Sequence, residues 1–339
     1  MPTTREREGQ TPVHELKRVL VTGGGGFLGG HLCERLLADG VEVTCVDDLS
    51  TSAPTAANLL RGRPGYHFVR HDISEPLIGR HTDVDTVFHL ASPASPVDYL
   101  RLPVQTLRTG ALGTANVLDI AERCGARMVL ASTSEVYGDP LQHPQAETYW
   151  GNVNPVGPRS VYDEAKRFAE ALTFAYRRVR SADVGVARIF NTYGPRMRAD
   201  DGRMVPTFCS QALAGEPITV TGSGQQTRSL CYVDDTVDAL VALARSDCAG
   251  PANVGNPVEL SVLHIAELIR DLAGSESPIH FLPAAEDDPQ RRCPDITLAR
   301  DHLGWQPRVS YRAGLEVTVD WFRAQLREAT ATSAALQGS

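Results

Sequence analysis

Four consecutive glycines lie near the start of the chain, between a run typical of a buried strand and a run typical of an amphipathic helix. The strand is predicted from Arg18 to Val21 and the helix from about Phe27 to Ala38. Gly23, Gly26 and Gly29 have G-x-x-G-x-x-G spacing. Glycines permit a tight turn and a close approach of ligand to backbone, and amides at a helix start attract a diphosphate. The loop therefore favours a dinucleotide site, although glycine spacing alone also suits a flexible turn.

An acidic residue follows the second predicted strand, Val41 to Val46. Asp47 comes 18 residues after Gly29, where its carboxylate can bind both hydroxyls of a ribose. It would repel a 2'-phosphate, and no Arg or Lys occurs in residues 46–60 to compensate. We therefore predict NAD rather than NADP. The predicted cofactor-binding residues are Gly23, Gly26, Phe27, Leu28, Gly29, Asp47, Asp48, Asp72, Ile73, Leu90, Ala91, Tyr162 and Lys166.

Short apolar runs and amphipathic stretches alternate over the first half of the chain. Further strands are predicted at Thr86–Leu90, Met128–Ala131 and Val184–Ile189, and long helices from about Pro103 to Arg123, ended by Gly125, and from Ser160 to Val179. This alternation predicts an α/β fold, a Rossmann-type doubly wound parallel sheet.

Glycine and proline become frequent after residue 190, which indicates a change of architecture. We predict an NAD-binding domain over 15–190 and a smaller C-terminal α+β substrate-binding portion over 191–328, with about 230–256 returning to the first domain. Residues 1–14 and 329–339 lack periodic apolar positions and are predicted to be disordered.

Composition excludes several classes of partner. The net charge of -8 argues against nucleic acid and membrane surfaces, which are anionic. The seven cysteines are scattered without a Cys-x-x-Cys pair or metal-ligand spacing, so we expect reduced thiols and no metal. No apolar run is long enough to span a bilayer and the opening residues are polar, which predicts a cytoplasmic protein.

Tyr162 and Lys166 lie four residues apart on the second long predicted helix, so their side chains share one face. A nearby ammonium favours the phenolate form of a tyrosine, whose ordinary pKa is about 10. The pair can then remove a hydroxyl proton while the nicotinamide takes a hydride. The same spacing also occurs in ordinary surface pairs, and its meaning here comes from the nucleotide-binding half upstream.

From about Arg18 to Phe322 the chain resembles the extended short-chain dehydrogenase/reductases that act on nucleotide sugars, and most closely the UDP-glucuronate decarboxylases, or UDP-xylose synthases. The similar segments are His89–Pro96, Ala131–Pro140, Arg188–Met197, and Asp287-Asp288-Pro289-Gln290 followed by Arg291-Arg292. The resemblance implies a homodimer in which the helices around 103–123 and 160–179 form a four-helix contact.

The triplet Thr133-Ser134-Glu135 separates neighbouring reactions within that family. Related dehydratases carry Thr-Asp-Glu there, with the aspartic acid protonating the leaving hydroxyl, and Ser134 cannot replace it. Epimerases usually have small or neutral residues and no glutamate. The triplet also suits an ordinary strand end with a helix-capping Ser or Thr. The resemblance implies Tyr162, Lys166, Thr133, Glu135, Ser134 and Arg292 as catalytic residues.

The implied reaction is oxidation of UDP-glucuronate at carbon 4, loss of carbon dioxide, and return of the hydride to give UDP-xylose. Arg292 would act at the reacting end, as a donor or by holding the water that protonates carbon 5. Arg159 is similar to an arginine that meets the sugar acid. The implied substrate-binding residues are Tyr99, Arg159, Asn191, Arg196, Val205, Arg228 and Arg292. The alternatives are a nucleotide-sugar 4-epimerase and, more remotely, a non-catalytic NAD-sensing protein.

Three positions depart from the family pattern. Asn is common where this chain has Gly110, Gly where it has Ala165, and an aromatic residue where it has Thr221. We expect the first to alter packing near the nicotinamide, the second to be mild or stabilising on a helix, and the third to affect uracil recognition.

Overall fold

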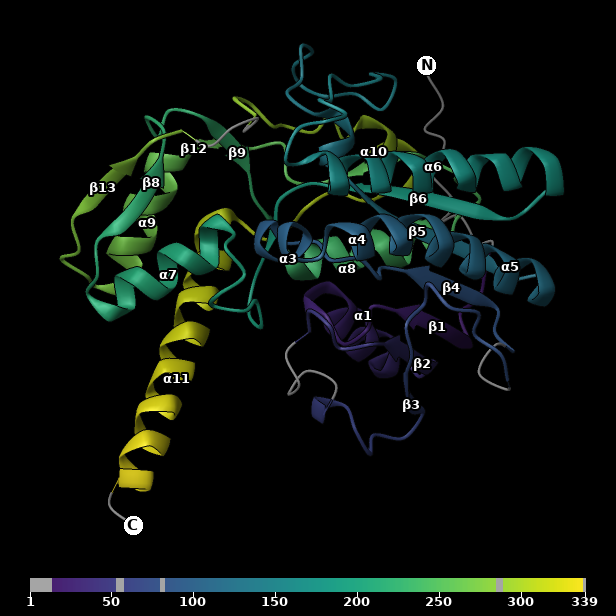
Figure 1. Ribbon diagram of the computed structural model, residues 1–339, viewed down its shortest axis with the longest axis horizontal. Helices are drawn as coiled ribbons and strands as arrows, with labels where there is room; N and C mark the ends of the chain where they lie inside the picture. The colour runs from purple at the N-terminus through teal and green to yellow at the C-terminus, as the bar shows by residue number, and fades with distance from the viewer. Residues whose placement is uncertain (1–13, 53–57, 80–82, 285–288, 338–339) are drawn as a thin grey trace, which may run out of the picture.

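The computed structural model describes residues 14–52, 58–79, 83–284 and 289–337, so Asp287 and Asp288 of the family-like segment lie outside the described residues. Its centre is a seven-stranded sheet in the order β11-β6-β5-β4-β1-β2-β3, and every pairing is parallel (Figure 1). The strands are β1 Arg18–Thr22, β2 Glu42–Asp47, β3 Tyr66–Arg70, β4 Thr86–His89, β5 Arg127–Thr133, β6 Val184–Ile189 and β11 Ala252–Val254. The predicted Rossmann-type fold class is confirmed.

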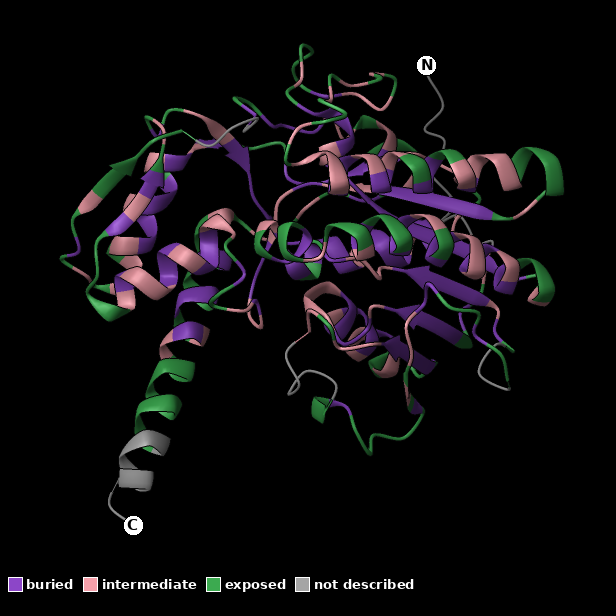
Figure 2. Ribbon diagram, in the orientation of Figure 1, coloured by how far each residue is buried: buried purple, intermediate pink, exposed green. Residues whose placement is uncertain are grey.

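Helices cover both faces of the sheet, which is why its central strands are buried (Figure 2). On one face α5 (Thr114–Cys124) and α6 (Ser160–Arg180) pack together against the strands β4 to β6. On the other face α1 (Phe27–Ala38) packs against α8 (Val233–Ala244). The carboxyl ends of all seven strands consequently share one edge, where the loops can form a ligand site.

The long helix predicted near residue 103 is interrupted. Helix α4 runs Pro103–Arg108, a π-helical turn η2 follows at Thr109–Gly113, and α5 continues to Cys124. Gly125 ends α5 in the left-handed conformation at φ 62°, as predicted. Helix α4 and the π turn both pack on α6, so the interruption lies against the helix that carries Tyr162 and Lys166.

The smaller lobe is built from short pairs of strands and three packed helices. The strands β8 (Ile218–Thr221) and β13 (Ile279–Leu282) pair in parallel, and β9 (Thr227–Ser229) pairs antiparallel with β12 (Glu259–Ser261). Helices α7 (Met204–Ala214), α9 (Val262–Ala273) and α11 (Tyr311–Gln337) pack on one another. The remaining elements are α3 (Pro96–Arg101), η3 (Ser134–Tyr137), β7 (Thr192–Tyr193), β10 (Cys231–Tyr232) and α10 (Thr297–Leu303).

Helix α11 projects from the smaller lobe, and its residues 324–331 are exposed (Figures 1 and 2). It continues to Gln337, into the segment 329–339 that the sequence predicts to be disordered. The segment is rich in alanine, which has the highest helix propensity. Within the described ranges, no helix is both long enough and apolar enough to cross a membrane.

Candidate active site

One cavity follows the carboxyl edge of the sheet and brings together most of the residues predicted from the sequence. It is bordered by the glycine loop after β1, the end of β2, the loop after β4, the end of β5 and the start of α6. The predicted residues that line it are Gly23, Gly26, Phe27, Leu28, Gly29, Asp47, Asp48, Asp72, Ile73, Leu90, Ala91, Thr133, Ser134, Glu135, Tyr162, Lys166, Asn191, Arg196 and Val205.

The glycine loop has the shape that a dinucleotide requires. Gly23 has φ 73°, and a Cβ there would lie 2.7 Å from the backbone nitrogen of Ala91. A Cβ at Gly29 would lie 2.1 Å from the carbonyl oxygen of Gly23, so only glycine lets α1 start this close to the loop. Asp47 ends β2 nearby, 8% exposed, and its Oδ2 accepts a hydrogen bond from the Gly25 amide at 2.9 Å. These residues fit NAD, with the glycine loop for its diphosphate and Asp47 for a ribose.

Tyr162 and Lys166 are both buried on the first two turns of α6 and face the cavity. The Lys166 Nζ lies 5.9 Å from the centre of the Tyr162 ring and donates a hydrogen bond to the Ala131 carbonyl at 2.8 Å. The Thr133 side chain interacts with the Tyr162 phenol, and its Oγ1 accepts a hydrogen bond from the Glu135 amide at 3.2 Å, where it caps η3. Thr133 therefore serves both as the helix cap and as a partner of the phenol.

Burial dominates the ionisation of this pair in the protein without nucleotide. It raises the pKa of Tyr162, with the negative charge of Glu135 adding to the effect, and it lowers the pKa of Lys166 to about 8. In this state the effect of burial therefore outweighs that of the Lys166 ammonium, and the neutral phenol is favoured. Desolvation opposes the charged form of both groups, so a low phenol pKa requires positive charge beyond that of Lys166.

Glu135 is held between two arginines. Arg292 donates to it through both terminal nitrogens, one bond measuring 2.7 Å to Oε2, and Arg159 donates to the same oxygen. Burial alone would raise the pKa of Glu135, but the charges of Arg292 and Arg159 lower it to about 2. Arg292 is 3% exposed. The triad is thus a charge-assisted network at the edge of the cavity, with a carboxylate that stays ionised.

Tyr99 reaches the site from α3. Its ring stacks on that of Tyr162, with centroids 5.3 Å apart and planes inclined by 10°, and the side chain is 3% exposed. Burial raises the pKa of Tyr99 to about 12, so its hydroxyl stays protonated. The loop predicted to lie near the sugar is thus in direct contact with the predicted base.

Arg228, which was predicted to bind substrate, and Thr221, which departs from the family pattern, do not line this cavity. Arg228 on β9 is 7% exposed and donates to the carbonyl of Pro289 at 2.8 Å. Thr221 ends β8, is exposed, and accepts a bond on its carbonyl from Gln226. Arg196, which does line the cavity, has φ 69° and forms an ion pair with Glu34 of α1.

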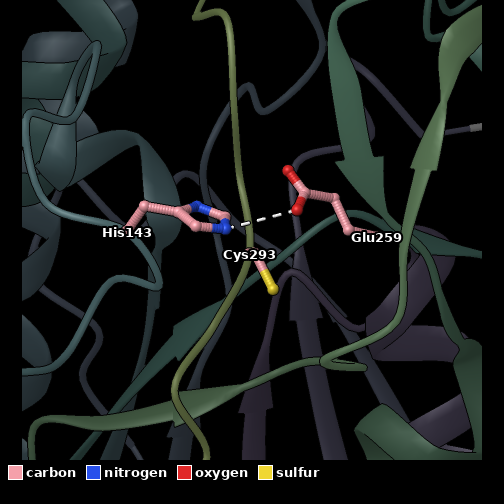
Figure 3. Close-up of side chains that lie close together, drawn as sticks. All are labelled: His143, Glu259 and Cys293. Atoms are coloured by element: carbon pink, nitrogen blue, oxygen red, sulfur yellow. Dashed lines mark ion pairs between the residues drawn. The ribbon is translucent and has the colours of Figure 1, made fainter.

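The described residues include one cluster with metal-ligand chemistry that the sequence did not predict. His143, Glu259 and Cys293 place their ligand atoms within 4.8 Å of one another (Figure 3). Arg291 already lies among them, 3.0 Å from the Glu259 carboxylate and 2.7 Å from the His143 ring. Burial raises the pKa of the Cys293 thiol, which disfavours the thiolate that a metal needs. We therefore interpret the guanidinium as the cation of this cluster, which anchors the segment that carries Arg292.

Sequence reasoning missed Asp163, which follows Tyr162 on α6. Its side chain is 5% exposed and its Oδ1 has no hydrogen-bond partner among the residues that the structure describes. Burial and the charge of Glu135 raise its pKa to about 7. A charged residue on a helix ordinarily indicates an exposed face, so only the packing of α6 against η3 could have revealed it.

Comparison with known proteins agrees with this geometry. Residues 19–255 match the NAD dependent epimerase/dehydratase family. The chain is 52% identical to UDP-glucuronic acid decarboxylase 1 of Xenopus tropicalis, covering 91% of this chain and 73% of that protein. It is 51% identical to UDP-glucuronic acid decarboxylase 2 of Arabidopsis thaliana, covering 91% and 69%.

A similar solved structure is the Y149F mutant of UDP-glucuronic acid 4-epimerase from Bacillus cereus, in complex with UDP-4-deoxy-4-fluoro-glucuronic acid and NAD. The TM-score is 0.80 at 27% identity, covering 91% of this chain and 99% of that chain.

Proposed function

Because the chain belongs to the NAD dependent epimerase/dehydratase family, we propose that it converts UDP-glucuronate into UDP-xylose and carbon dioxide. The observation that carries the proposal is the ionised Glu135, held by Arg159 and Arg292 beside the buried Tyr162. Ser134 has no acid to expel a hydroxyl group, which argues against a dehydratase. The non-catalytic NAD sensor is disfavoured because the complete set of Tyr162, Lys166, Thr133 and Glu135 borders one cavity.

The first step needs a base for the hydroxyl on sugar carbon 4. Tyr162 takes that proton, assisted by Thr133 and Lys166. Bound NAD would supply a reversible hydride acceptor for carbon 4 and positive charge near the phenol. Its binding residues are the glycine loop and Asp47, which border the same cavity.

The resulting ketone lies beta to the carboxylate on carbon 5, so the bond to the carboxyl carbon can break heterolytically. Carbon dioxide leaves, and the electron pair moves into an enolate whose oxygen accepts hydrogen bonds from Tyr162 and Thr133. Carbon 5 then takes a proton, and Tyr162 returns its own proton to the carbon 4 oxygen. The donors lower the barrier because they are in place before the negative charge develops.

We assign the polar residues at the substrate end by their chemistry. The guanidinium of Arg159 suits the sugar carboxylate, and Arg292 suits the reacting end, since both lie at the Glu135 network. Tyr99 lies against the sugar through its stacking on Tyr162. For the UDP moiety we propose Asn191, Arg196, Val205 and, by rearrangement of the smaller lobe, Arg228.

We further propose that the protein works as a homodimer in the cytoplasm. Apolar side chains are exposed along the neighbouring helices α4 and α6, including Val104 at 68%, Leu107 at 43% and Phe168 at 51%. A second copy related by a two-fold axis would cover this face with a four-helix contact. Sedimentation of wild type and Val104→Glu tests this, and a monomeric wild type at micromolar concentration would refute it.

The experiment that tests the activity is incubation of the purified protein with UDP-glucuronate, without added cofactor. The product is identified by mass and proton NMR. We expect UDP-xylose from the wild type and almost none from Tyr162→Phe, while that variant still binds UDP. UDP-galacturonate without loss of mass would instead establish the 4-epimerase alternative.

A further inference from the structure

Decarboxylation with return of the hydride consumes one proton in each turnover. The carboxylate leaves as carbon dioxide without a proton, and carbon 5 gains one. The proton on Tyr162 does not meet this need, because Tyr162 takes it from the carbon 4 hydroxyl and gives it back. The proton for carbon 5 must therefore enter from solvent, along a route that the steps described above do not contain.

A second cavity lies on the other side of the Glu135 network. Glu135 lines the first cavity, whereas its two partners Arg159 and Arg292 line the second. The other lining residues are Gly138, Asp139, Asn152, Val153, Asn154, Asp163, Pro289 and Gln290. Asp139, Asn152 and Asn154 are exposed, so this cavity reaches solvent. The two ion pairs of Glu135 therefore join residues of the first cavity to residues of the second.

Asp163 is a titratable side chain close to these two ion pairs. It lines the second cavity, it is nine-tenths buried, and its Oδ1 is unpaired among the described residues. The Nε of Arg292, which lines the same cavity, is buried and unpaired among the described residues in the same way. We propose that Asp163 is the proton-relay residue that passes the carbon 5 proton from water in the second cavity across the Glu135–Arg292 pair. This inference rests on the proposed decarboxylation.

The charges around Asp163 suit a group that gains and loses a proton near neutrality. Burial and the negative charge of Glu135 raise its pKa to about 7, Arg159 and Arg292 lower it, and Glu164 on the same helix raises it. From α3, Tyr99 also interacts with Asp163 but stays neutral. The carboxyl group is thus protonated in part of the population at neutral pH, gives its proton inward, and takes another from cavity water.

The test compares the wild type with Asp163→Asn and with Glu164→Gln, which removes the adjacent carboxylate of α6. We expect Asp163→Asn to lower kcat about 10- to 100-fold with KM changed less than about threefold, and to lose the fall of kcat as pH rises through about 7. Small weak acids such as imidazolium should restore part of the rate. Glu164→Gln should keep the kcat of the wild type at low pH and keep the pH-dependent limb, moved slightly to lower pH because a charge that raises the pKa of Asp163 is lost. Asp163→Glu should also keep the limb.

Two further measurements keep the inference testable if Asp163→Asn folds poorly. Val153→Phe narrows the second cavity without removing the carboxyl group and should also lower kcat. Infrared difference spectra of wild type against Asp163→Glu, with no substrate present, should contain a protonated carboxyl band whose position differs between the two proteins and that disappears as pH rises through about 7. An active wild type whose kcat and pH profile are unchanged by Asp163→Asn, or by Val153→Phe, would overturn the relay and leave the decarboxylation standing. An inactive wild type would overturn the proposed function first.

Discussion

A side chain at Gly110 would collide with that of Ala165. A Cβ at Gly110 would lie 2.8 Å from the Ala165 Cβ and 2.9 Å from its carbonyl oxygen. Gly110 belongs to the π turn η2, and Ala165 lies on α6 one residue before Lys166. Two departures from the family pattern are thus in contact, and the missing side chain at one position accommodates the added methyl group at the other.

The first prediction is that these two positions are energetically coupled. Gly110→Asn should lower the free energy of unfolding by about 1–3 kcal/mol through overpacking, and Ala165→Gly by about 1 kcal/mol through helix propensity. The double variant should recover part of the first loss, because removal of the methyl group relieves the contact at 2.8 Å while the contact with the carbonyl oxygen remains. Urea denaturation of all four proteins gives the coupling energy, and additive effects would mean that the contact is not coupled.

The second prediction concerns the carboxylate of Glu135. Glu135→Gln should lower kcat about 100-fold or more, because the ionised partner of Arg159 and Arg292 is lost. It should also change acid sensitivity. A pKa lowered to about 2 in the folded state means that the wild type gains stability above the ordinary value of 4.5 and loses it as pH falls towards 2.

Steady-state kinetics and acid denaturation of wild type, Glu135→Gln and the control Glu164→Gln measure both effects. The stability difference between wild type and Glu135→Gln should narrow as pH falls below 4.5. A difference independent of pH over that range would contradict the pairing of Glu135 with the two arginines.

The third prediction uses the fact that the chain has only two lysines, Lys17 and Lys166. Burial lowers the pKa of Lys166 to about 8, from 10.5 in an exposed chain. Between pH 8 and 10.5 the unfolded chain binds more protons at this residue, so its contribution to stability increases with pH across that window. Below pH 8 Lys166 is charged in both the folded and the unfolded chain, so the penalty for its desolvation does not change with pH.

Lysine-selective ¹³C labelling should therefore give two side-chain resonances in the protein freed of nucleotide, one titrating near pH 8. Lys166→Met should remove that resonance, and Lys17→Met should remove the other. Lys166→Met should have a higher free energy of unfolding than the wild type at pH 8, because it lacks the buried charge. This difference should become smaller between pH 8 and 10.5. If both lysines titrate above pH 10, the burial of Lys166 is not as the structure describes.

The fourth prediction concerns cofactor choice. Asp47→Asn keeps an oxygen for the Gly25 amide but removes the charge, so NAD should bind roughly 10-fold more weakly and the preference over NADP should decrease. Calorimetric titration of nucleotide-free protein measures both affinities, with Glu42→Gln at the exposed start of β2 as the control. Unchanged affinity for NAD would exclude the carboxylate as a ribose ligand.

The elements that the sequence predicts correctly are those with a regular apolar periodicity. Helix α1 and strand β6 occur over the predicted residues, and the predicted helix from Ser160 extends only one residue further, to Arg180. The π turn at Thr109–Gly113 was not predicted, because residues on both sides of it keep a helical pattern and the extra residue is absorbed within one turn. The position of the turn is explained only by the contact between Gly110 and Ala165, which are far apart in the sequence.

The candidate site, too, could be predicted from the sequence only in part. The glycine loop, Asp47 and the pair of Tyr162 and Lys166 are local patterns, and the structure brings them to one cavity. The clamp on Glu135, the stacking of Tyr99 and the burial of Asp163 depend on segments far apart in the chain. No local pattern encodes these contacts, since Arg292 reaches Glu135 from 157 residues away.

The most direct test of the central claim follows the hydrogen on carbon 4. UDP-glucuronate carrying deuterium at that carbon is incubated with the wild type in ordinary water, and the product is analysed by mass and proton NMR. A hydride that is removed and returned within one active site should give UDP-xylose that keeps the deuterium at carbon 4. UDP-xylose without that deuterium, or a uronic acid of unchanged mass, would contradict the account.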